Sequence, residues 1–337
     1  MKHNRKLFAL FTIIAAVALI ASCAPAATSV KTGSTEKKAY EIAVVVKIVG
    51  IPWFNVLEDG VKKAAKELGV NAYVLGPTAA DPAQQVKIVE DLVAKGVDAI
   101  VVVPNDASSL VPVFKKAHEK GIVIITNESP GQEGADYDLE SIDQDTYGIG
   151  MFNLLVKHMG TSGEYAVMIG SLTVPLDNHI TDLGTAWMEK NYPNIKLATP
   201  RIPCAEDQAL SREKALELIK AYPNLKGIIG VGSLGPIGSA QAVREKGLQD
   251  KITVVGASVP SEASDYFKDG SIDELILWSP SDSGYGTVWL AKYILDGNKP
   301  ATGVKMDDGK TMKLDGNIVV VDSMAYITKD NVDSFGF

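Results

Sequence analysis

The chain has 337 residues, of which 46% are hydrophobic and 22% charged, and its formal net charge is -8. This composition is typical of a folded globular protein and argues against intrinsic disorder or a coiled coil. The negative net charge argues against a wide basic groove, so no nucleic-acid partner is expected. At roughly 100–200 residues per domain, the length predicts two domains.

The N-terminal residues predict export and attachment to a membrane. Positive charges precede an apolar run at 7–21, which is shorter than the about 20 residues that a membrane span needs. The run ends in the letters IASC, which resemble a bacterial lipobox. The resemblance implies a lipoprotein signal peptide over 1–22, lipidation of Cys23 and a flexible tether over 23–39. We therefore expect an exported protein, lipid-anchored in the periplasm or at the outer face of the cytoplasmic membrane.

From Tyr40 onward, short apolar runs alternate with amphipathic stretches. The β-branched runs predict buried parallel strands, and the helical spacing of apolar residues predicts helices between them. In chain order, the pattern predicts a strand at 41–46, a helix from Asn55 to Gly69, a strand at 71–75, a helix at 82–95, a strand at 98–103, a helix at 107–120 and a strand at 121–126.

The same alternation restarts after residues 141–148. Strands are predicted at 165–169, 196–202, 227–231 and 252–256, with helices at 147–159, 178–191, 207–221 and 236–246. A strand at 272–278, a helix at 283–296 and a strand at 317–321 complete the chain. Two such series predict an α/β fold with two doubly wound parallel-sheet lobes.

One glycine-rich turn is a candidate nucleotide site. The letters GVGSLG at 230–235 match the pattern that brings backbone amides to a pyrophosphate. The next strand, however, ends in Gly256 with no acid to hold a ribose, and Pro236 removes one amide at the start of the helix. The dinucleotide interpretation is therefore disfavoured, and no cofactor is expected.

Motifs for metal binding or nucleophilic catalysis are also missing from the sequence. His118, His158 and His179 lie far apart, without ligands at metal-binding spacing. No nucleophile elbow or phosphate-binding loop occurs, and Cys204 has no histidine nearby in sequence. We expect no metal and no catalytic residues, although an enzyme that modifies sugars stays an alternative.

Polar and aromatic residues follow the predicted strands, where ligands bind in open α/β sheets. The candidate ligand-binding residues are Lys47, Trp53, Phe54, Asn105, Asp106, Glu128, Asp177, Asn178, Pro236, Ser258 and Trp278. Amide and carboxylate groups pair with sugar hydroxyls, and aromatic faces cover the C–H surfaces of a sugar. Each residue also has a structural explanation: Asn55 and Asp106 suit helix N-caps, Trp53 and Trp278 suit the core, and Lys47 could reach solvent.

The residues from about 40 to 337 resemble the ribose-type periplasmic solute-binding proteins of ABC importers, within them the rhamnose and autoinducer-2 receptors. The segments that carry the resemblance are KIVGIPWFNVLEDGVKKAAKELGV (47–70), PNDASSLVPVFKKAHEKGIVIIT (104–126), LWSPSDSG (277–284) and ITKDNVDSFGF (327–337). The resemblance implies the type I fold, in which three strands form a hinge between two lobes. It implies a first lobe of 40–142 plus 279–320 and a second of 143–278 plus 321–337.

The resemblance also implies roles for single residues. Lys47 matches the lysine that autoinducer-2 receptors use, and Pro236 matches their proline. Glu128 stands where those receptors have Asp, Asp177-Asn178 where they have Asp-Gln, and Gly238 where they have Ala. These departures argue against autoinducer-2, because misplaced polar groups in a buried site cost about 1–3 kcal/mol each. Asn105 and Asp106 match the sugar-receptor pattern more generally.

The sequence therefore predicts a non-catalytic, monomeric substrate-binding lipoprotein of an ABC importer. Its ligand would be a monosaccharide, rhamnose-like or another simple sugar. Its partners would be a membrane permease and, through Cys23, the lipid bilayer. An autoinducer-2 receptor is the alternative.

Overall fold

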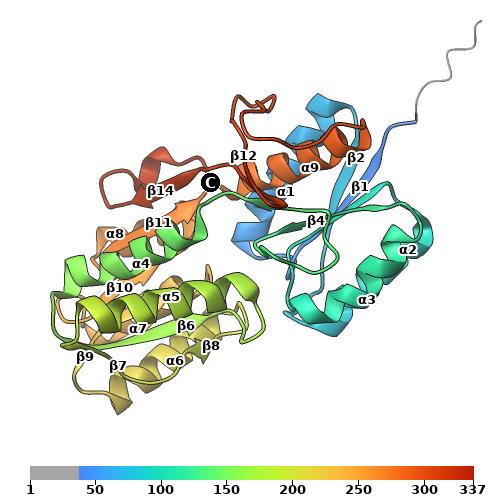
Figure 1. Cartoon of the computed structure of the whole chain (residues 1–337). Coiled ribbons are helices and arrows are strands. Elements are labelled where there is room, and N and C mark those ends of the chain that lie inside the picture. Colours follow the sequence, from blue (N-terminus) through green and yellow to red (C-terminus); the bar gives the residue numbers. More distant parts are fainter. Residues whose placement is uncertain (1–37) are drawn as a thin grey trace, which may run out of the picture. The chain divides into compact units, whose positions relative to one another are not determined.

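The computed structural model describes residues 38–337. The predicted signal peptide, the lipidation site Cys23 and almost all of the predicted tether lie outside the described residues. From Ala39 to Phe337 the chain forms one compact unit with two seven-stranded sheets (Figure 1). No helix in this part of the chain combines the length and the apolar character that crossing a bilayer requires.

The first sheet has the strand order β12-β13-β5-β4-β3-β1-β2. Its strands are β1 (Glu41–Val45), β2 (Asn71–Leu75), β3 (Ala99–Val102), β4 (Val123–Asn127), β5 (Tyr137–Glu140), β12 (Lys313–Asp315) and β13 (Ile318–Val320). All neighbouring pairs are parallel except β12 with β13. The sheet is thus built mostly from the N-terminal half of the chain, and a late hairpin completes one edge.

The second sheet has the order β14-β11-β10-β9-β6-β7, with β8 also paired to β6. Its strands are β6 (Gly163–Ile169), β7 (Ile195–Leu197), β8 (Ile202–Pro203), β9 (Leu225–Gly230), β10 (Thr253–Gly256), β11 (Glu274–Trp278) and β14 (Met324–Ile327). Here only β14 runs antiparallel to its neighbour, β11.

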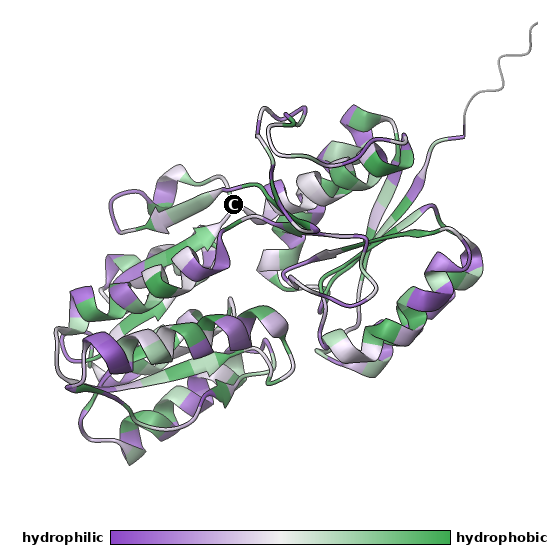
Figure 2. Cartoon of the chain, viewed as in Figure 1, coloured by the Kyte–Doolittle hydropathy of each residue, from purple (hydrophilic) through white to green (hydrophobic). Residues whose placement is uncertain are grey.

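Helices cover both faces of the sheets. The nine helices among the described residues are α1 (Pro52–Leu68), α2 (Pro82–Lys95), α3 (Ala107–His118), α4 (Gln144–Met159), α5 (Pro175–Asn191), α6 (Gln208–Ala221), α7 (Gly235–Lys246), α8 (Pro260–Lys268) and α9 (Pro280–Leu295), followed by the short 3-10 helix Val332–Ser334. In β1, Ala43 and Val45 belong to a cluster with α2 and α3, whereas Ile42 and Val44 belong to the cluster with α1. Figure 2 shows largely apolar strands and helices in which apolar and polar residues are mixed.

The chain passes three times between the two sheets: from β5 to α4, from β11 to α9, and from β13 to β14. The crossings are tied together. The hydroxyls of Ser141 and Ser283 lie 2.5 Å apart, and the backbone N–H groups of Val321 and Ser323 donate to the carbonyls of Glu140 and Ser141 at 2.7 and 2.9 Å. The two α/β lobes are therefore joined by the three-segment hinge that the sequence predicted.

The predicted fold class is confirmed: both sheets are predominantly parallel, with β12 and β14 as antiparallel edges. Several local predictions were wrong. The run at 196–202 breaks into two short strands, β7 and β8. β5, β12 and α8 were not anticipated, since none has a long apolar run. α1 begins at Pro52, so Asn55 is inside the helix and does not cap it, and Trp53 and Phe54 lie in its first turn rather than in a loop.

Candidate functional site

A pocket lies between the two lobes, at the carboxyl ends of the strands. It is lined by Lys47, Ile51, Trp53, Phe54, Glu128, Leu176, Asp177, Glu206, Val231, Gly232, Ser233, Ala257 and Trp278. The first five come from the first lobe and the others from the second. The lobes also touch beside the pocket, where the Thr173 hydroxyl donates to the Asn105 carbonyl at 2.8 Å.

Four charged side chains meet in this pocket. Lys47 follows β1, Glu128 follows β4 directly, and Asp177 lies in the first turn of α5. The ammonium of Lys47 lies 3.1 Å from Glu128 Oε2, and 3.9 Å from Oε1 of Glu206, which belongs to the other lobe. Asp177 Oδ2 accepts a hydrogen bond from the Gly170 backbone N–H at 2.7 Å. The pocket thus gathers one cation and three carboxylates, all buried.

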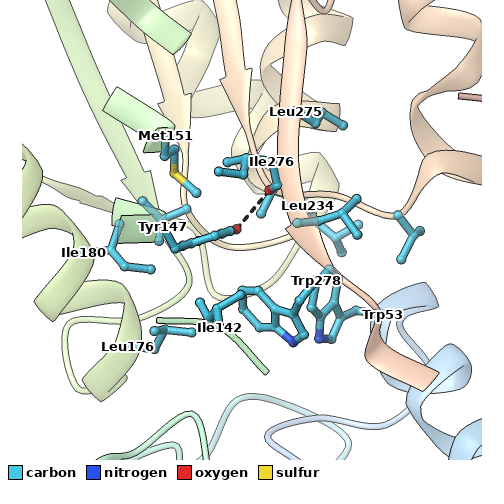
Figure 3. Packing of buried hydrophobic residues seen from close by; sticks show 14 of the residues in the cluster. Trp53, Ile142, Tyr147, Met151, Leu176, Ile180, Leu234, Leu275, Ile276 and Trp278 are labelled. Carbon is cyan, nitrogen blue, oxygen red and sulfur yellow. Dashed lines mark hydrogen bonds between the residues drawn. The ribbon is translucent and has the colours of Figure 1, made fainter. Parts of the chain in front are cut away.

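Aromatic rings form the apolar wall. The rings of Trp53, on α1, and Trp278, at the end of β11, meet edge to face with centroids 4.9 Å apart. Tyr147 packs against the other side of Trp278 at 5.2 Å, and its hydroxyl donates to the Ile276 carbonyl at 2.9 Å (Figure 3). Trp278 is therefore held between a residue of each lobe, which supplies a rigid surface of the kind that sugar rings contact.

The structure brings six of the eleven predicted site residues together around the pocket. These are Lys47, Trp53, Phe54, Glu128, Asp177 and Trp278. The other five, Asn105, Asp106, Asn178, Pro236 and Ser258, do not line it, and their local contacts explain why.

Two of these five residues form hydrogen bonds within the loops of the first lobe. Asn105 donates its amide to the Lys47 carbonyl at 2.7 Å, and its backbone N–H donates to buried Gln85 at 2.8 Å. It therefore positions the backbone of Lys47. Asp106 is the N-cap of α3 and accepts from the Ser109 N–H at 2.7 Å, so its capping role was the correct alternative.

The remaining three belong to the second lobe. Asn178 donates to the carbonyls of Leu172 and Val174 and accepts from Arg201 at 2.6 Å, so its amide is engaged within its own lobe. Pro236 is in the first turn of α7, where proline is well tolerated. Ser258 is fully buried beside the pocket-lining Ala257, and its hydroxyl has no hydrogen-bond partner within the described residues.

Sequence reasoning missed Glu206. It lies in the loop between β8 and α6, a few residues after the run at 196–202 that was predicted as one strand. Ala205 and Glu206 adopt the left-handed conformation, with φ of 53° and 52°, and Glu128 does so with φ of 63°. These three are the non-glycine residues with positive φ among residues 38–337. Such conformations cost about 1–3 kcal/mol and gather at binding sites, and here two of them place pocket carboxylates.

The glycine-rich turn also has a structural explanation. A Cβ at Gly230 would overlap Pro236, and a Cβ at Gly232 would lie 3.1 Å from Glu206 Oε2. The glycines therefore make room for the start of α7 and for the Glu206 carboxylate. No group of three or more residues suited to a metal ion occurs among residues 38–337.

Burial and mutual repulsion shift the pKa values of the carboxylates upward. Burial raises the pKa of Glu128 and of Asp177, while Lys47 opposes the shift in both. Burial, with Asp177 and Glu128 nearby, raises the pKa of Glu206 to about 7. Burial lowers the pKa of Lys47, but the surrounding Glu128, Asp177 and Glu206 outweigh it and raise the pKa overall. Lys47 therefore stays charged at neutral pH while Glu206 titrates.

This titration predicts a specific pH dependence of stability. Between the pKa of an unfolded glutamate, about 4.3, and about 7 the folded state holds the proton of Glu206 and the unfolded state has lost it. The free energy of unfolding then falls as pH rises through this window. Urea denaturation of wild type and Glu206→Gln at pH 5 and pH 8 measures the effect. We expect the variant to gain about 1–3 kcal/mol relative to wild type at the higher pH; an equal difference at both pH values would contradict it.

The chain belongs to the periplasmic binding protein domain family, whose model matches residues 42–299. This makes the protein a binding protein with the type I periplasmic fold and not an enzyme. Among similar curated proteins, the D-allose-binding periplasmic protein of Escherichia coli K12 is 24% identical over 290 residues, covering 84% of this chain and 92% of that protein. The ribose import binding protein RbsB of Bacillus subtilis 168 is 23% identical over 272 residues, covering 80% and 86%.

Solved structures share the fold. LsrB from Clostridium saccharobutylicum in complex with AI-2 superposes with a TM-score of 0.81 at 22% identity, covering 88% of this chain and 100% of that one. An ABC transporter solute-binding protein from Clostridium phytofermentas with bound L-rhamnose gives 0.82 at 20% identity, covering 88% and 98%.

Proposed function

We propose that this protein is the substrate-binding lipoprotein of an ABC importer and that it binds a monosaccharide, rhamnose-like or another simple sugar, between its lobes. The observation that carries the proposal is a pocket between the lobes that combines three carboxylates and Lys47 with the rings of Trp53, Phe54 and Trp278. Relatives named for ribose and allose binding support the same ligand class.

Binding would couple to lobe closure. The pocket takes charged groups from both lobes, so a ligand can contact Lys47 and Asp177 together only when the lobes meet. Such a ligand shifts the population toward the closed arrangement. The closed lobes would then dock on a membrane permease, and the lipid anchor at Cys23 would keep the protein near it. We take the lobe bounds as 40–142 plus 279–320 and 143–278 plus 321–337, and we expect a monomer.

An autoinducer-2 receptor is the second candidate, favoured by the superposition on LsrB. Lys47 and Asp177, which match that candidate, line the pocket, and so does Glu128, which stands where those receptors have Asp. Asn178 and Pro236 do not line it: the first hydrogen-bonds to the backbone of its own lobe, and the second is in the first turn of α7. The departures at Glu128, Asn178 and Gly238 argue for a sugar instead.

A thermal-shift panel tests the proposal. We would use the full chain, kept in mild detergent because of its apolar residues 7–21, with rhamnose, ribose, xylose, galactose, fucose and autoinducer-2 with and without borate. A specific ligand at 100 times its Kd should stabilise the protein by about 2.7 kcal/mol, which raises the midpoint by several degrees. A shift with one sugar is the expected result. A shift only with autoinducer-2 would favour the second candidate. No shift with any member of this panel, nor with glucosamine, galactosamine or mannosamine, would refute the ligand class.

A further inference from the structure

The pocket holds more negative than positive charge. Among its lining residues the charged groups are Lys47, Glu128, Asp177 and Glu206, with exposed fractions of 6, 4, 2 and 6%. One cation therefore faces three carboxylates with little access to solvent. Charges in such surroundings are costly unless each has a partner.

Two of the three carboxylates have partners. Glu128 pairs with Lys47 at 3.1 Å. Asp177 accepts from the Gly170 N–H at 2.7 Å and lies in the first turn of the 17-residue helix α5, where the backbone favours negative charge. The single cation of the pocket is therefore paired with Glu128, and the carboxylate of Asp177 is stabilised by the backbone.

Glu206 is left without a comparable partner. Within residues 38–337, the cation nearest to it is Lys47, at 3.9 Å, and Lys47 is closer to Glu128. No hydrogen bond to its side chain occurs in the described part of the chain, and its carboxylate faces the cavity. The protein nevertheless keeps two consecutive left-handed residues, Ala205 and Glu206, to hold it there.

Two glycines leave room for the carboxylate of Glu206. A Cβ at Gly170 would overlap Glu206 Oε1 and would lie 3.1 Å from Asp177 Oδ2. The carboxylates of Glu206 and Asp177 thus approach the same point from two sides. A Cβ at Gly232 would lie 3.1 Å from Glu206 Oε2. The pair forms an anionic corner in the second lobe, separate from the Lys47–Glu128 pair of the first lobe.

We infer that the physiological ligand is an amino sugar, whose protonated amine lies at the corner formed by Glu206 and Asp177. The inference rests on the proposed function and narrows its ligand class. A neutral sugar could donate hydroxyls to these carboxylates, but the excess negative charge would then stay buried unless Glu206 took up a proton. An ammonium group compensates it and makes the stronger, charge-assisted hydrogen bonds. The aromatic wall of Trp53 and Trp278 is also compatible with a nearby cation.

Calorimetric titration at pH 7 tests the inference with matched ligands. The panel pairs glucosamine, galactosamine and mannosamine with their parent hexoses and with their N-acetyl derivatives, which keep the nitrogen but lose its charge. We expect one amino sugar to bind at least tenfold more tightly than both of its neutral counterparts. In Glu206→Gln the preference should fall to threefold or less.

Two further variants separate placement from charge. In Gly170→Ala the carboxylate of Glu206 is present but displaced, so the amine preference should also fall. Glu213→Gln removes an exposed carboxylate from the following helix, α6, and should leave the preference intact. Circular dichroism confirms that each variant is folded.

The outcomes distinguish the inference from the proposed function. Tighter binding of neutral hexoses or other neutral sugars than of every amino sugar would overturn the inference and leave the proposed function standing. A preference for the amine that survives Glu206→Gln would also overturn it. If no sugar, charged or neutral, binds in calorimetry, both the inference and the proposed function fail.

Discussion

Lys47→Met is expected to lower ligand affinity by about tenfold to a hundredfold and to destabilise the protein by about 3 kcal/mol at pH 8. Lys47 is the single cation among four buried charges in the pocket. Its loss removes a charged hydrogen bond to the ligand, worth about 1.5–3 kcal/mol. It also leaves Glu128 without its ion-pair partner, and breaking a buried pair costs about 3–5 kcal/mol.

The same variant should be less destabilised at pH 5 than at pH 8. Lys47 lowers the pKa values of Glu128, Asp177 and Glu206, so without it these groups hold protons to higher pH. At pH 5 the folded protein can keep them neutral, whereas at pH 8 it must lose those protons or unfold. Urea denaturation at both pH values measures the difference.

The control for this prediction is Lys62→Met on α1. Lys62 pairs with Glu58 at the surface, where its side chain is 63% exposed, and such pairs contribute about 0–1 kcal/mol. A second variant, Lys47→Met combined with Glu128→Gln, should recover part of the lost stability by removing the unpaired carboxylate. If the double variant is no more stable than Lys47→Met, the electrostatic account of the site is wrong.

How much of the site could be predicted from the sequence depends on what positions each residue. Lys47 and Glu128 were predictable because they follow apolar strands within a residue or two, and parallel strands end at one edge. Asn105 and Asn178 stand at the same edge, yet their amides bond to nearby backbone groups. The apolar pattern of a strand predicts that the residues after it lie at this edge of the sheet. It does not predict where their side chains point, because local hydrogen bonds such as these decide that.

Glu206 is a pocket residue that the sequence pattern did not predict. The run before it was predicted as one strand over 196–202, but it breaks into two short strands, of which β8 has only two residues. Its left-handed backbone is unusual for glutamate and has no sequence signature of the kind that glycine provides. One usable signal was Asp207, the N-cap of α6, because a residue directly before a helix start lies near the strand ends in this fold. The fold could therefore be predicted more fully than the site, since apolar periodicity reports burial and not loop geometry.

The close packing of α1 against α9 gives the largest expected loss of stability from a small substitution. A Cβ at Gly60 would overlap the backbone carbonyl of Ser281 and lie 2.9 Å from its Cα, and a Cβ at Gly284 would overlap the Leu57 carbonyl. The obstacles are backbone atoms, which cannot rotate away. The contact lies next to the hinge, because Ser281 follows the crossing at Trp278 and precedes the Ser283–Ser141 contact.

Gly60→Ala should therefore destabilise the protein by about 2 kcal/mol, although alanine is the better helix former. Alanine gains about 1 kcal/mol in a helix interior, but overpacking typically costs about 1–3 kcal/mol and more where backbone must move. Gly148→Ala on α4 is the matched control, since its Cβ would meet its nearest neighbour at 3.5 Å, and it should be neutral or stabilising. Urea denaturation of both variants measures the difference. Because α1 carries Trp53 and α9 begins beside Trp278, a displaced helix contact should also weaken ligand binding in Gly60→Ala and not in Gly148→Ala; equal stability of the two variants would contradict the packing argument.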